Sequence, residues 1–301
     1  MTAPFDRVVV VDWSAASTPK RGRDSIWIAE RDVATDRVRT SNPPTRALAL
    51  ARLIELASSG GRTLIGVDAC LGYPAGTAAA LGLPVGRGEA GAPWAATWAL
   101  LAAEVTDGPD NANDRFEVAA ALNARIGPGP GPFWGCPPRR AGPHLTTTKA
   151  PSDPLPEWRA VEATLRARGF RPFSCWQLLG AGAVGSQSLL AIAALRRLRV
   201  EVTATTDRAV DVWPLSTGLV VPEAPVVLAE VWPTLRPSAA PGDDRAAAGR
   251  GERVRDEAQV EDLSAHLAAL ERDGALDAAF TPDVGGAERA VVAEEGWVLG
   301  V

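Results

Sequence analysis

Acidic residues end or interrupt three strongly apolar stretches of this sequence. Asp12 ends the run RVVVVD, Asp68 ends TLIGVD, and Glu230 lies inside VVLAEVW. An ionised carboxylate in apolar surroundings is costly unless it is paired or binds a cation. The four residues before each acid include no Lys or Arg, so the local sequence offers no obvious counter-ion. A hard divalent cation with oxygen ligands is the simplest neutraliser, and the three acids therefore predict a metal site.

A second interpretation of each acid remains open. An Asp after a strand often caps the following turn by accepting backbone N–H bonds. A common functional site is favoured over separate turn caps when Asp12, Asp68 and Glu230 are considered together with Asp256, which lies at the start of a predicted helix. Acids that end adjacent strands lie within about 5 Å of each other. Like charges at that distance raise a pKa or recruit a divalent metal.

The elements that must position these acids follow from the hydrophobic pattern. Near-continuous β-branched runs are typical of strands buried on both faces, while shorter alternating runs predict hairpin strands. We predict five such strands, at residues 7–12, 25–30, 36–40, 63–68 and 226–232. A predicted helix over residues 45–58, ended by Gly60-Gly61, joins an antiparallel meander to the strand that ends in Asp68. The Asp12 and Asp68 strands are then expected to be parallel neighbours in a mixed sheet.

The remaining segments complete an α/β fold with a single core over residues 1–301. Further helices are predicted at residues 156–169, 186–198 and 256–271, with a last short strand at residues 296–301. Residues 72–155 alternate weak helices with Pro/Gly-rich loops such as GPGPGP, which predicts an inserted cap over the sheet rather than core. Residues 237–251 are low in bulky apolar side chains and are expected to be mobile.

The bulk composition excludes several classes of protein. The 31 basic and 36 acidic residues give a net charge of -5, which argues against a protein that coats nucleic acid. The three cysteines are widely separated and odd in number, so we expect a reducing cytoplasm and no disulfide framework. The sequence shows neither a secretory leader nor a run of about 18 apolar residues, so we expect no membrane association.

Motifs along nearly the whole chain resemble a known family. They are VVVVDWSAAS, IGVDACLGYP, QLLGAGAVGSQ, AEVWP and RDEAQV. The strand ending in Asp12, the hairpin, the helix and the strand ending in Asp68 resemble the ribonuclease H-like fold. More narrowly, the chain is similar to uncharacterised proteins described as ribonuclease H-like nucleases, some of which carry a molybdopterin-guanine-dinucleotide-synthesis label.

The resemblance implies a metal-dependent phosphodiester hydrolase, a nuclease, acting on a phosphoester or nucleic acid. In that superfamily such acids hold two divalent ions, usually Mg²⁺ or Mn²⁺, which activate a water and stabilise the leaving oxygen. Carried over to this sequence, the metal ligands and catalytic residues are Asp12, Asp68, Glu230 and Asp256. Glu257 and Asp262 lie close enough along the chain to replace Asp256 as the last ligand.

Two other functions stay open on the same scaffold. Sugar kinases and actin-like ATPases also begin with a strand, an Asp and a polar hairpin that holds phosphate. DWSAASTPKRGRD resembles that hairpin loosely, and Ser14 and Lys20 within it are candidate phosphate-binding residues. An ATP-dependent phosphotransferase is therefore one alternative. A binding module that has kept the scaffold without catalysis is the other.

A glycine motif offers a further candidate ligand site. Gly180-Ala-Gly-Ala-Val-Gly185 has the spacing of a dinucleotide-binding loop and opens a predicted helix. The preceding SCWQLL is a poor buried strand, so we expect no dinucleotide to bind. Free N–H groups at this turn, together with Gln187, could instead face an anionic substrate. His144 and His266 lie 122 positions apart in unlike contexts and predict neither a zinc site nor a catalytic triad.

Overall fold

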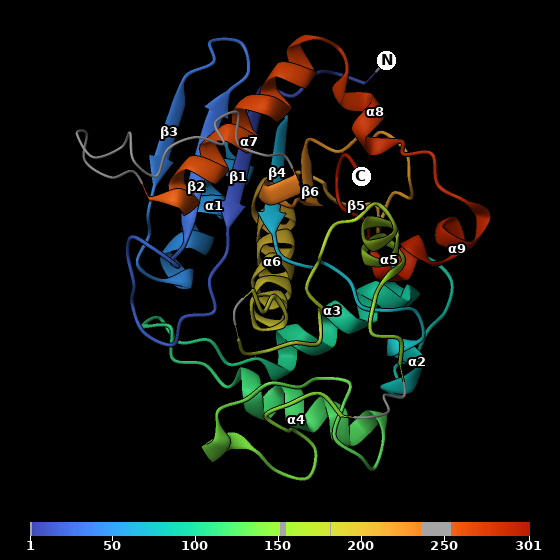
Figure 1. Cartoon of the computed structure of the whole chain (residues 1–301). Helices are drawn as coiled ribbons and strands as arrows, with labels where there is room; N and C mark the ends of the chain where they lie inside the picture. Colours follow the sequence, from blue (N-terminus) through green and yellow to red (C-terminus); the bar gives the residue numbers. More distant parts are fainter. Residues whose placement is uncertain (1, 151–154, 181, 236–253) are drawn as a thin grey trace.

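The strands that end in Asp12 and Asp68 lie side by side within a six-stranded mixed sheet (Figure 1). The computed structural model describes residues 2–150, 155–180, 182–235 and 254–301. The sheet order is β3-β2-β1-β4-β6-β5. Its strands are β1 (Arg7–Asp12), β2 (Trp27–Asp32), β3 (Val38–Ser41), β4 (Thr63–Asp68), β5 (Val210–Trp213) and β6 (Val226–Glu230).

Strand directions divide the sheet into two parts. β1, β2 and β3 form an antiparallel meander, whereas β1, β4, β6 and β5 run parallel. The predicted meander and the predicted parallel pairing of the Asp12 and Asp68 strands are both confirmed. Because β1, β4, β6 and β5 run parallel, their carboxyl ends fall at one edge of the sheet, and this part of the sheet brings the ends of β1, β4 and β6 together.

Helices cover both faces of the sheet. They are α1 (Arg46–Ser58), α2 (Thr77–Ala80), α3 (Pro93–Glu104), α4 (Arg115–Ile126), α5 (Ala160–Ala167), α6 (Gly185–Thr206), α7 (Arg255–Arg272), α8 (Leu276–Phe280) and α9 (Gly286–Glu295). Short 3₁₀ turns occupy Glu89–Gly91, Pro138–Arg140 and Pro233–Leu235. No helix of the described segments is long and apolar enough to cross a bilayer.

Each face of the sheet packs into its own hydrophobic cluster. On the first face, Val9 and Val11 of β1 join side chains of α1, α3 and α6. On the second face, Val8 and Val10 join side chains of α5, α7 and α8. The continuous valine run of β1 is thus explained, because the strand is buried on both faces as predicted. α7 lies across β1 and β2 on the second face (Figure 1).

Several boundaries and one whole region differ from the expectation. β5, a four-residue strand, was not predicted, and α6 continues to Thr206, eight residues beyond its predicted end. Residues 296–301 form no strand; Val298 makes only an isolated bridge to Glu230. The sequence alone does not show whether a short apolar run after a long helix forms a strand, because tertiary packing rather than intrinsic propensity decides whether the run pairs with the sheet. The segment 237–251 lies outside the described residues.

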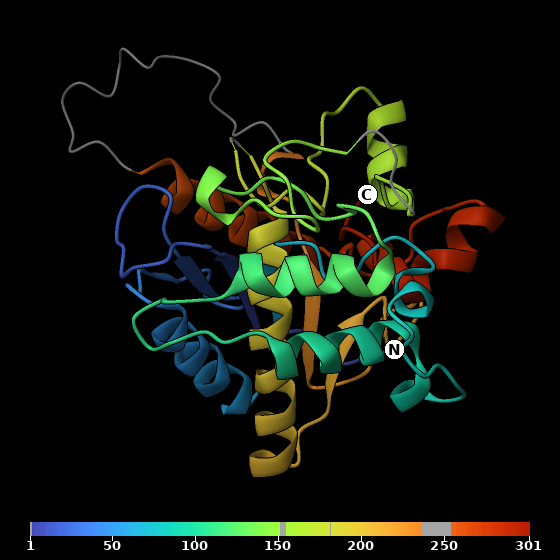
Figure 2. The same ribbon diagram turned by 90° about the horizontal axis from the view of Figure 1, so that it is seen from below.

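The inserted region does more than cover the sheet. Helices α3 and α4 cross α6 (Figure 2). Trp94, Trp98 and Leu101 of α3 are buried in the same cluster as the β1 valines. The expectation that residues 72–155 stand outside the core is therefore wrong for α3 and for the buried part of α4. Large aromatic side chains at helical spacing on α3 supply the apolar surface that α6 needs to bury.

Candidate functional site

Asp12 and Asp68 occupy equivalent positions at the carboxyl ends of parallel neighbouring strands. They are direct partners in the register of β1 and β4. Along its strand, Asp12 shares a face with Val8 and Val10, and Asp68 shares a face with Leu64; these apolar residues pack on the α7 face of the sheet. Both carboxylates therefore point toward the face that α7 covers, as a shared site requires.

Asp256 joins this pair from the first turn of α7. Its Oδ2 accepts a hydrogen bond from the backbone N–H of Asp24 at 2.7 Å. Because α7 packs on β1 and β2, its first turn is held above the end of β1. Glu257 and Asp262, the alternatives for this position, do not line the pocket that contains Asp12 and Asp68, whereas Asp256 does.

The electrostatics of the pair are unfavourable to two negative charges. Burial raises the pKa of Asp12 well above its ordinary value, and the charges of Asp68, Asp256 and Asp24 raise it further. Burial raises the pKa of Asp68 to about 7, with smaller contributions from Glu230 and Asp256. Only carboxylates contribute to these charge interactions among the described residues. In the described segments, no basic side chain lies beside Asp12 or Asp68 to neutralise them.

Glu230 has a counter-ion, contrary to the expectation from its local sequence. Arg159, fully buried just before α5, donates through Nη1 to Glu230 Oε2 at 2.7 Å and through Nη2 to Oε1. Its Nε donates to both carboxylate oxygens of Glu162 at 3.0 Å. The backbone N–H of Leu71 also donates to Glu230. The fold thus brings an arginine from 71 positions away, which no inspection of the β6 run could show.

Strand register also separates Glu230 from the aspartate pair. Glu230 is opposite Val67, and not Asp68, in the pairing of β4 and β6. Neighbouring residues of a strand point to opposite faces, so Asp68 and Glu230 project on opposite sides of the sheet. Glu230 still lines the same pocket as Asp12 and Asp68, and its charge helps to raise the pKa of Asp68. Its carboxylate is paired within a second group, the Arg159 cluster, made of Arg159, Glu162 and Glu230.

The Arg159 cluster has the compactness of a metal site but already contains a cation. Among the described residues, ligand atoms of Cys70, Glu162 and Glu230 lie within 4.8 Å of one another, and no other group of three does so. Arg159 pairs with both glutamates of this group, so a metal ion would meet a positive charge already in place. The oxygens of Asp12, Asp68 and Asp256 are spread more widely.

A pocket of about 590 Å³ opens in front of the aspartate pair. All three residues predicted to bind substrate line it: Ser14, Lys20 and Gln187. Gln187 Nε2 donates to the backbone oxygen of Trp13 at 2.6 Å, which fixes the start of the loop after β1. The Lys20 ammonium lies 3.6 Å from Asp24 Oδ2. The pocket therefore collects the predicted substrate residues and Asp12, Asp68 and Asp256 in one place.

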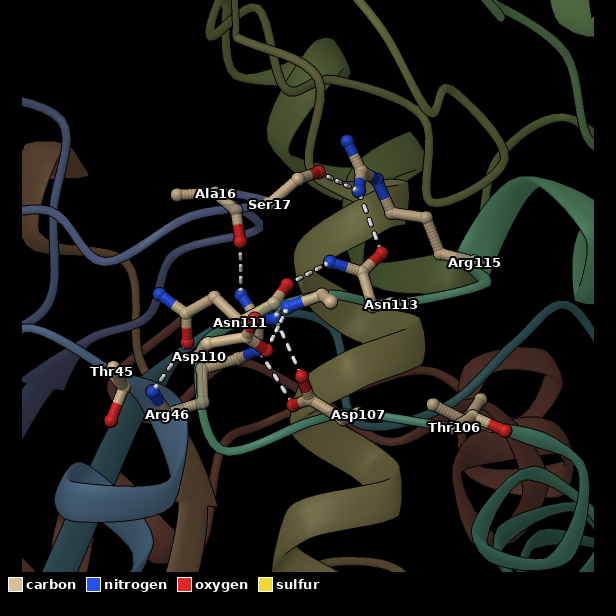
Figure 3. Close-up of polar contacts among 12 residues, drawn as sticks. Ala16, Ser17, Thr45, Arg46, Thr106, Asp107, Asp110, Asn111, Asn113 and Arg115 are labelled. Atoms are coloured by element: carbon tan, nitrogen blue, oxygen red, sulfur yellow. Dashed lines mark hydrogen bonds and ion pairs between the residues drawn. The ribbon is translucent and has the colours of Figure 1, made fainter.

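Two arginines outside the predicted set of site residues, Arg46 and Arg115, organise this part of the pocket. Arg46, buried at the start of α1, pairs with Asp107 through Nε and Nη2, both at 2.6 Å. It also donates to the backbone oxygens of Ser14 and Ala16, so it holds the loop after β1 (Figure 3). Arg115, the first residue of α4, lines the pocket itself. A buried arginine in an ordinary helix start carries no sequence signal that distinguishes it from a solvated one.

The glycine motif serves close packing in the structure. No strand precedes it in residues 174–179; the segment forms turns and a single bridge between Gln177 and Trp134. A side chain at Gly185 would meet the Cys175 and Gln177 backbone oxygens at 2.6 and 2.7 Å. Gly185 is therefore required by the approach of α6 to this turn. Neither His144 nor His266 lines the pocket.

Comparisons with protein-family models, with curated proteins and with solved structures give no match to this chain. The assignment of a function therefore depends on the geometry of the pocket.

Proposed function

We propose that this protein is a divalent-metal-dependent phosphodiester hydrolase whose metal ligands are Asp12, Asp68 and Asp256. The observation that carries the proposal is the register pairing of Asp12 with Asp68 in a pocket, without a basic partner in the described part of the chain. Two adjacent half-buried carboxylates without a counter-ion are costly unless one is protonated or they bind a cation. Ionisable groups kept in such an unfavourable environment are typical of functional sites.

The donor set fits Mg²⁺ or Mn²⁺. Asp12, Asp68 and Asp256 offer only carboxylate oxygens, the ligands these hard cations prefer. Glu230 is left out of the proposed ligand set because both of its oxygens accept hydrogen bonds from Arg159. When bound, such an ion supplies a Lewis acid and lowers the pKa of a coordinated water.

The residues of the chain have separate roles around that centre. Asp12 and Asp68 hold positions on rigid strands, so their relative placement does not depend on a loop. Asp256 approaches from α7 and is oriented by the Asp24 backbone N–H. Ser14, Lys20 and Gln187 form the adjoining wall, where hydroxyl, ammonium and amide groups can contact the oxygens of a phosphate.

We infer in addition that the scaffold is of the ribonuclease H-like kind. The features that support this are the strand, antiparallel hairpin, helix and parallel strand that connect Asp12 to Asp68, and the late helix that brings Asp256 to them. The kinase-like alternative would need a phosphate-binding turn after β1, and that segment has no glycine before Gly22.

The test is metal-dependent stability together with hydrolysis. Excess Mn²⁺ is expected to raise the thermal midpoint of the wild-type protein, because a ligand at 100 times its dissociation constant adds about 2.7 kcal/mol. Asp12→Asn should abolish that rise, while leaving the midpoint in EDTA unchanged or slightly higher as like-charge repulsion is relieved. The same variant should lose Mn²⁺-dependent cleavage of bis(4-nitrophenyl) phosphate.

Asp283→Asn, a change of an exposed acid that does not line the pocket, is the matched control and should behave as the wild type. A wild-type protein that is neither stabilised by Mn²⁺ or Mg²⁺ nor able to cleave the diester would overturn the proposal. The pocket would then be that of a non-catalytic binding module.

A further inference from the structure

A second part of the pocket carries a positive charge, opposite to that of the aspartate pair. Arg115 lines it and is held by three neutral acceptors: Nε donates to Ser186 Oγ at 3.0 Å, and Nη1 donates to Ser17 Oγ at 3.0 Å and Asn113 Oδ1 at 2.7 Å. Figure 3 shows the bonds to Ser17 and Asn113. No carboxylate of the described residues pairs with it. Its Nη2 amino group has no hydrogen-bond partner among those residues.

Arg115 is held in place by a chain of buried contacts. Asn113, which accepts from Arg115, donates to the backbone oxygen of Asn111. Asn111 is buried and accepts, through its side-chain oxygen, from the backbone N–H of Arg46. Arg46 is itself fixed by Asp107 (Figure 3). The Arg115 guanidinium also lies 4.3 Å from the Phe116 ring centroid. A cation so positioned, with one amino group unbonded at a pocket wall, is suited to an anionic ligand.

The same pocket has an exposed apolar wall. Phe173 and Leu179 line it with exposed fractions of 46% and 44%. Large apolar side chains that remain open to solvent on a pocket wall are suited to a planar ring, and an aromatic side chain stacks on the face of any base. Carboxylates for a metal, a cation without an acidic partner and an aromatic side chain therefore share one cavity.

The size of the cavity limits what fits there. A volume of about 590 Å³ lies in the usual range of pockets for small molecules, about 300–1,000 Å³. The net charge of -5 argues against a protein that coats a long duplex. We propose that the pocket binds a single nucleotide unit, with its phosphate on Arg115 and its base against Phe173. The reaction that the bound nucleotide would undergo rests on the proposed function. The binding of the nucleotide rests on the pocket alone.

The test measures binding without catalysis. Isothermal titration in EDTA compares the four ribonucleoside 5′-monophosphates with inorganic phosphate and with adenosine. Stacking tolerates every base, so we expect all four nucleotides to bind, and adenosine monophosphate to bind at least tenfold tighter than phosphate or adenosine alone. Arg115→Gln should weaken nucleotide binding by about 10- to 100-fold, the loss expected for a charged hydrogen bond, and leave adenosine binding unchanged. Arg115→Lys should keep part of the affinity.

Phe173→Leu should weaken adenosine and nucleotide binding by about 5-fold or more, and leave phosphate binding unchanged. The matched controls are Arg139→Gln and Phe170→Leu, which change an exposed arginine and an exposed phenylalanine that do not line the pocket. Both should bind nucleotides as the wild type does, and far-ultraviolet circular dichroism checks that each variant is folded.

The outcomes separate this inference from the proposed function. If Mn²⁺ stabilises the protein but no nucleotide binds more tightly than phosphate, the nucleotide assignment is overturned and the metal site stands. If nucleotides bind and both pocket variants lose affinity while Mn²⁺ has no effect, the nucleotide assignment stands and the hydrolase is overturned. Equal losses in the pocket variants and their controls would also overturn the nucleotide assignment.

Discussion

Two groups of acids meet at the same edge of the sheet and are treated differently by the fold. Glu162 and Glu230 share the buried Arg159, which bonds to both. Asp12 and Asp68 have carboxylates as charged neighbours (one another, Asp24, Asp256 and Glu230), and burial raises the pKa of both. Each group consists of carboxylates near strand ends in apolar surroundings. The difference is the presence of a guanidinium in one and its absence, among the described residues, in the other.

The difference separates a structural role from a functional one. A buried acid with its own cation can be ionised permanently and needs nothing from solution, so the Arg159 cluster can lock α5 to β6. A buried acid pair without a cation changes its state with pH or with a ligand. Acids of both groups line the pocket, and the aspartate pair is the group to which a ligand could supply a missing cation.

The largest effect is expected from removing the shared cation. Arg159→Met leaves Glu162 and Glu230 buried without a partner, so the free energy of unfolding should fall by about 3–5 kcal/mol. Urea-induced unfolding followed by tryptophan fluorescence measures this. Arg166→Met, on the exposed side of α5, is the control and should change stability by no more than about 0.5 kcal/mol. A loss below about 1 kcal/mol for Arg159→Met would contradict the structural role given to this cluster.

A smaller, pH-dependent effect is expected for the aspartate pair. The folded-state pKa of Asp68 is about 7, above its unfolded value of about 3.9. The folded protein therefore binds more protons between these values, and stability falls as pH rises from about 4 to 7. Asp68→Asn removes this loss, so in EDTA the variant should gain about 2–4 kcal/mol over the wild type across that range. Urea unfolding at several pH values measures the difference.

Asp32→Asn is the comparison variant for that measurement, because the pKa of Asp32 is lowered whereas that of Asp68 is raised. Hydrogen bonds from Thr35 lower the pKa of Asp32, so its contribution changes only below about pH 4 and should add no slope at higher pH. If Asp68→Asn and the wild type have the same pH dependence between pH 4.5 and 8, Asp68 ionises freely in the folded protein. The contrast between the two acidic groups would then disappear.

The smallest expected effect concerns stabilisation by Mn²⁺, to which the two acidic groups should contribute differently. Glu230→Gln should leave stabilisation by Mn²⁺ in place, because Glu230 is not a ligand in the proposed site. Asp68→Asn should abolish the stabilisation. Thermal unfolding over a Mn²⁺ titration gives both values, each relative to the variant's own stability in EDTA. Loss of the Mn²⁺ response in Glu230→Gln would return Glu230 to the ligand set and merge the two groups.

Local pattern was enough to find the strands that carry the acids. The boundaries of β1 and β4 agree with the valine-rich and isoleucine-rich runs that predict them, because a strand buried on both faces has no polar residue until it ends. The meander, the connecting helix and the parallel pairing follow from the order of these runs and from the preference for neighbouring connections. β5 and the core role of α3 were not predictable in this way, because both depend on packing against α6.

The sequence by itself determined that Asp12, Asp68 and Glu230 would all be carboxylates at the ends of buried strands. Only the tertiary structure decided which of them share a site. The register of β4 and β6 sets Glu230 opposite Val67, so one residue of offset turns it to the other face of the sheet. The fold then places Arg159 against Glu230, and no basic residue against Asp12 or Asp68, within the part of the chain that is described. Register and long-range charge pairing both join residues distant in sequence, and local composition carries no information on either.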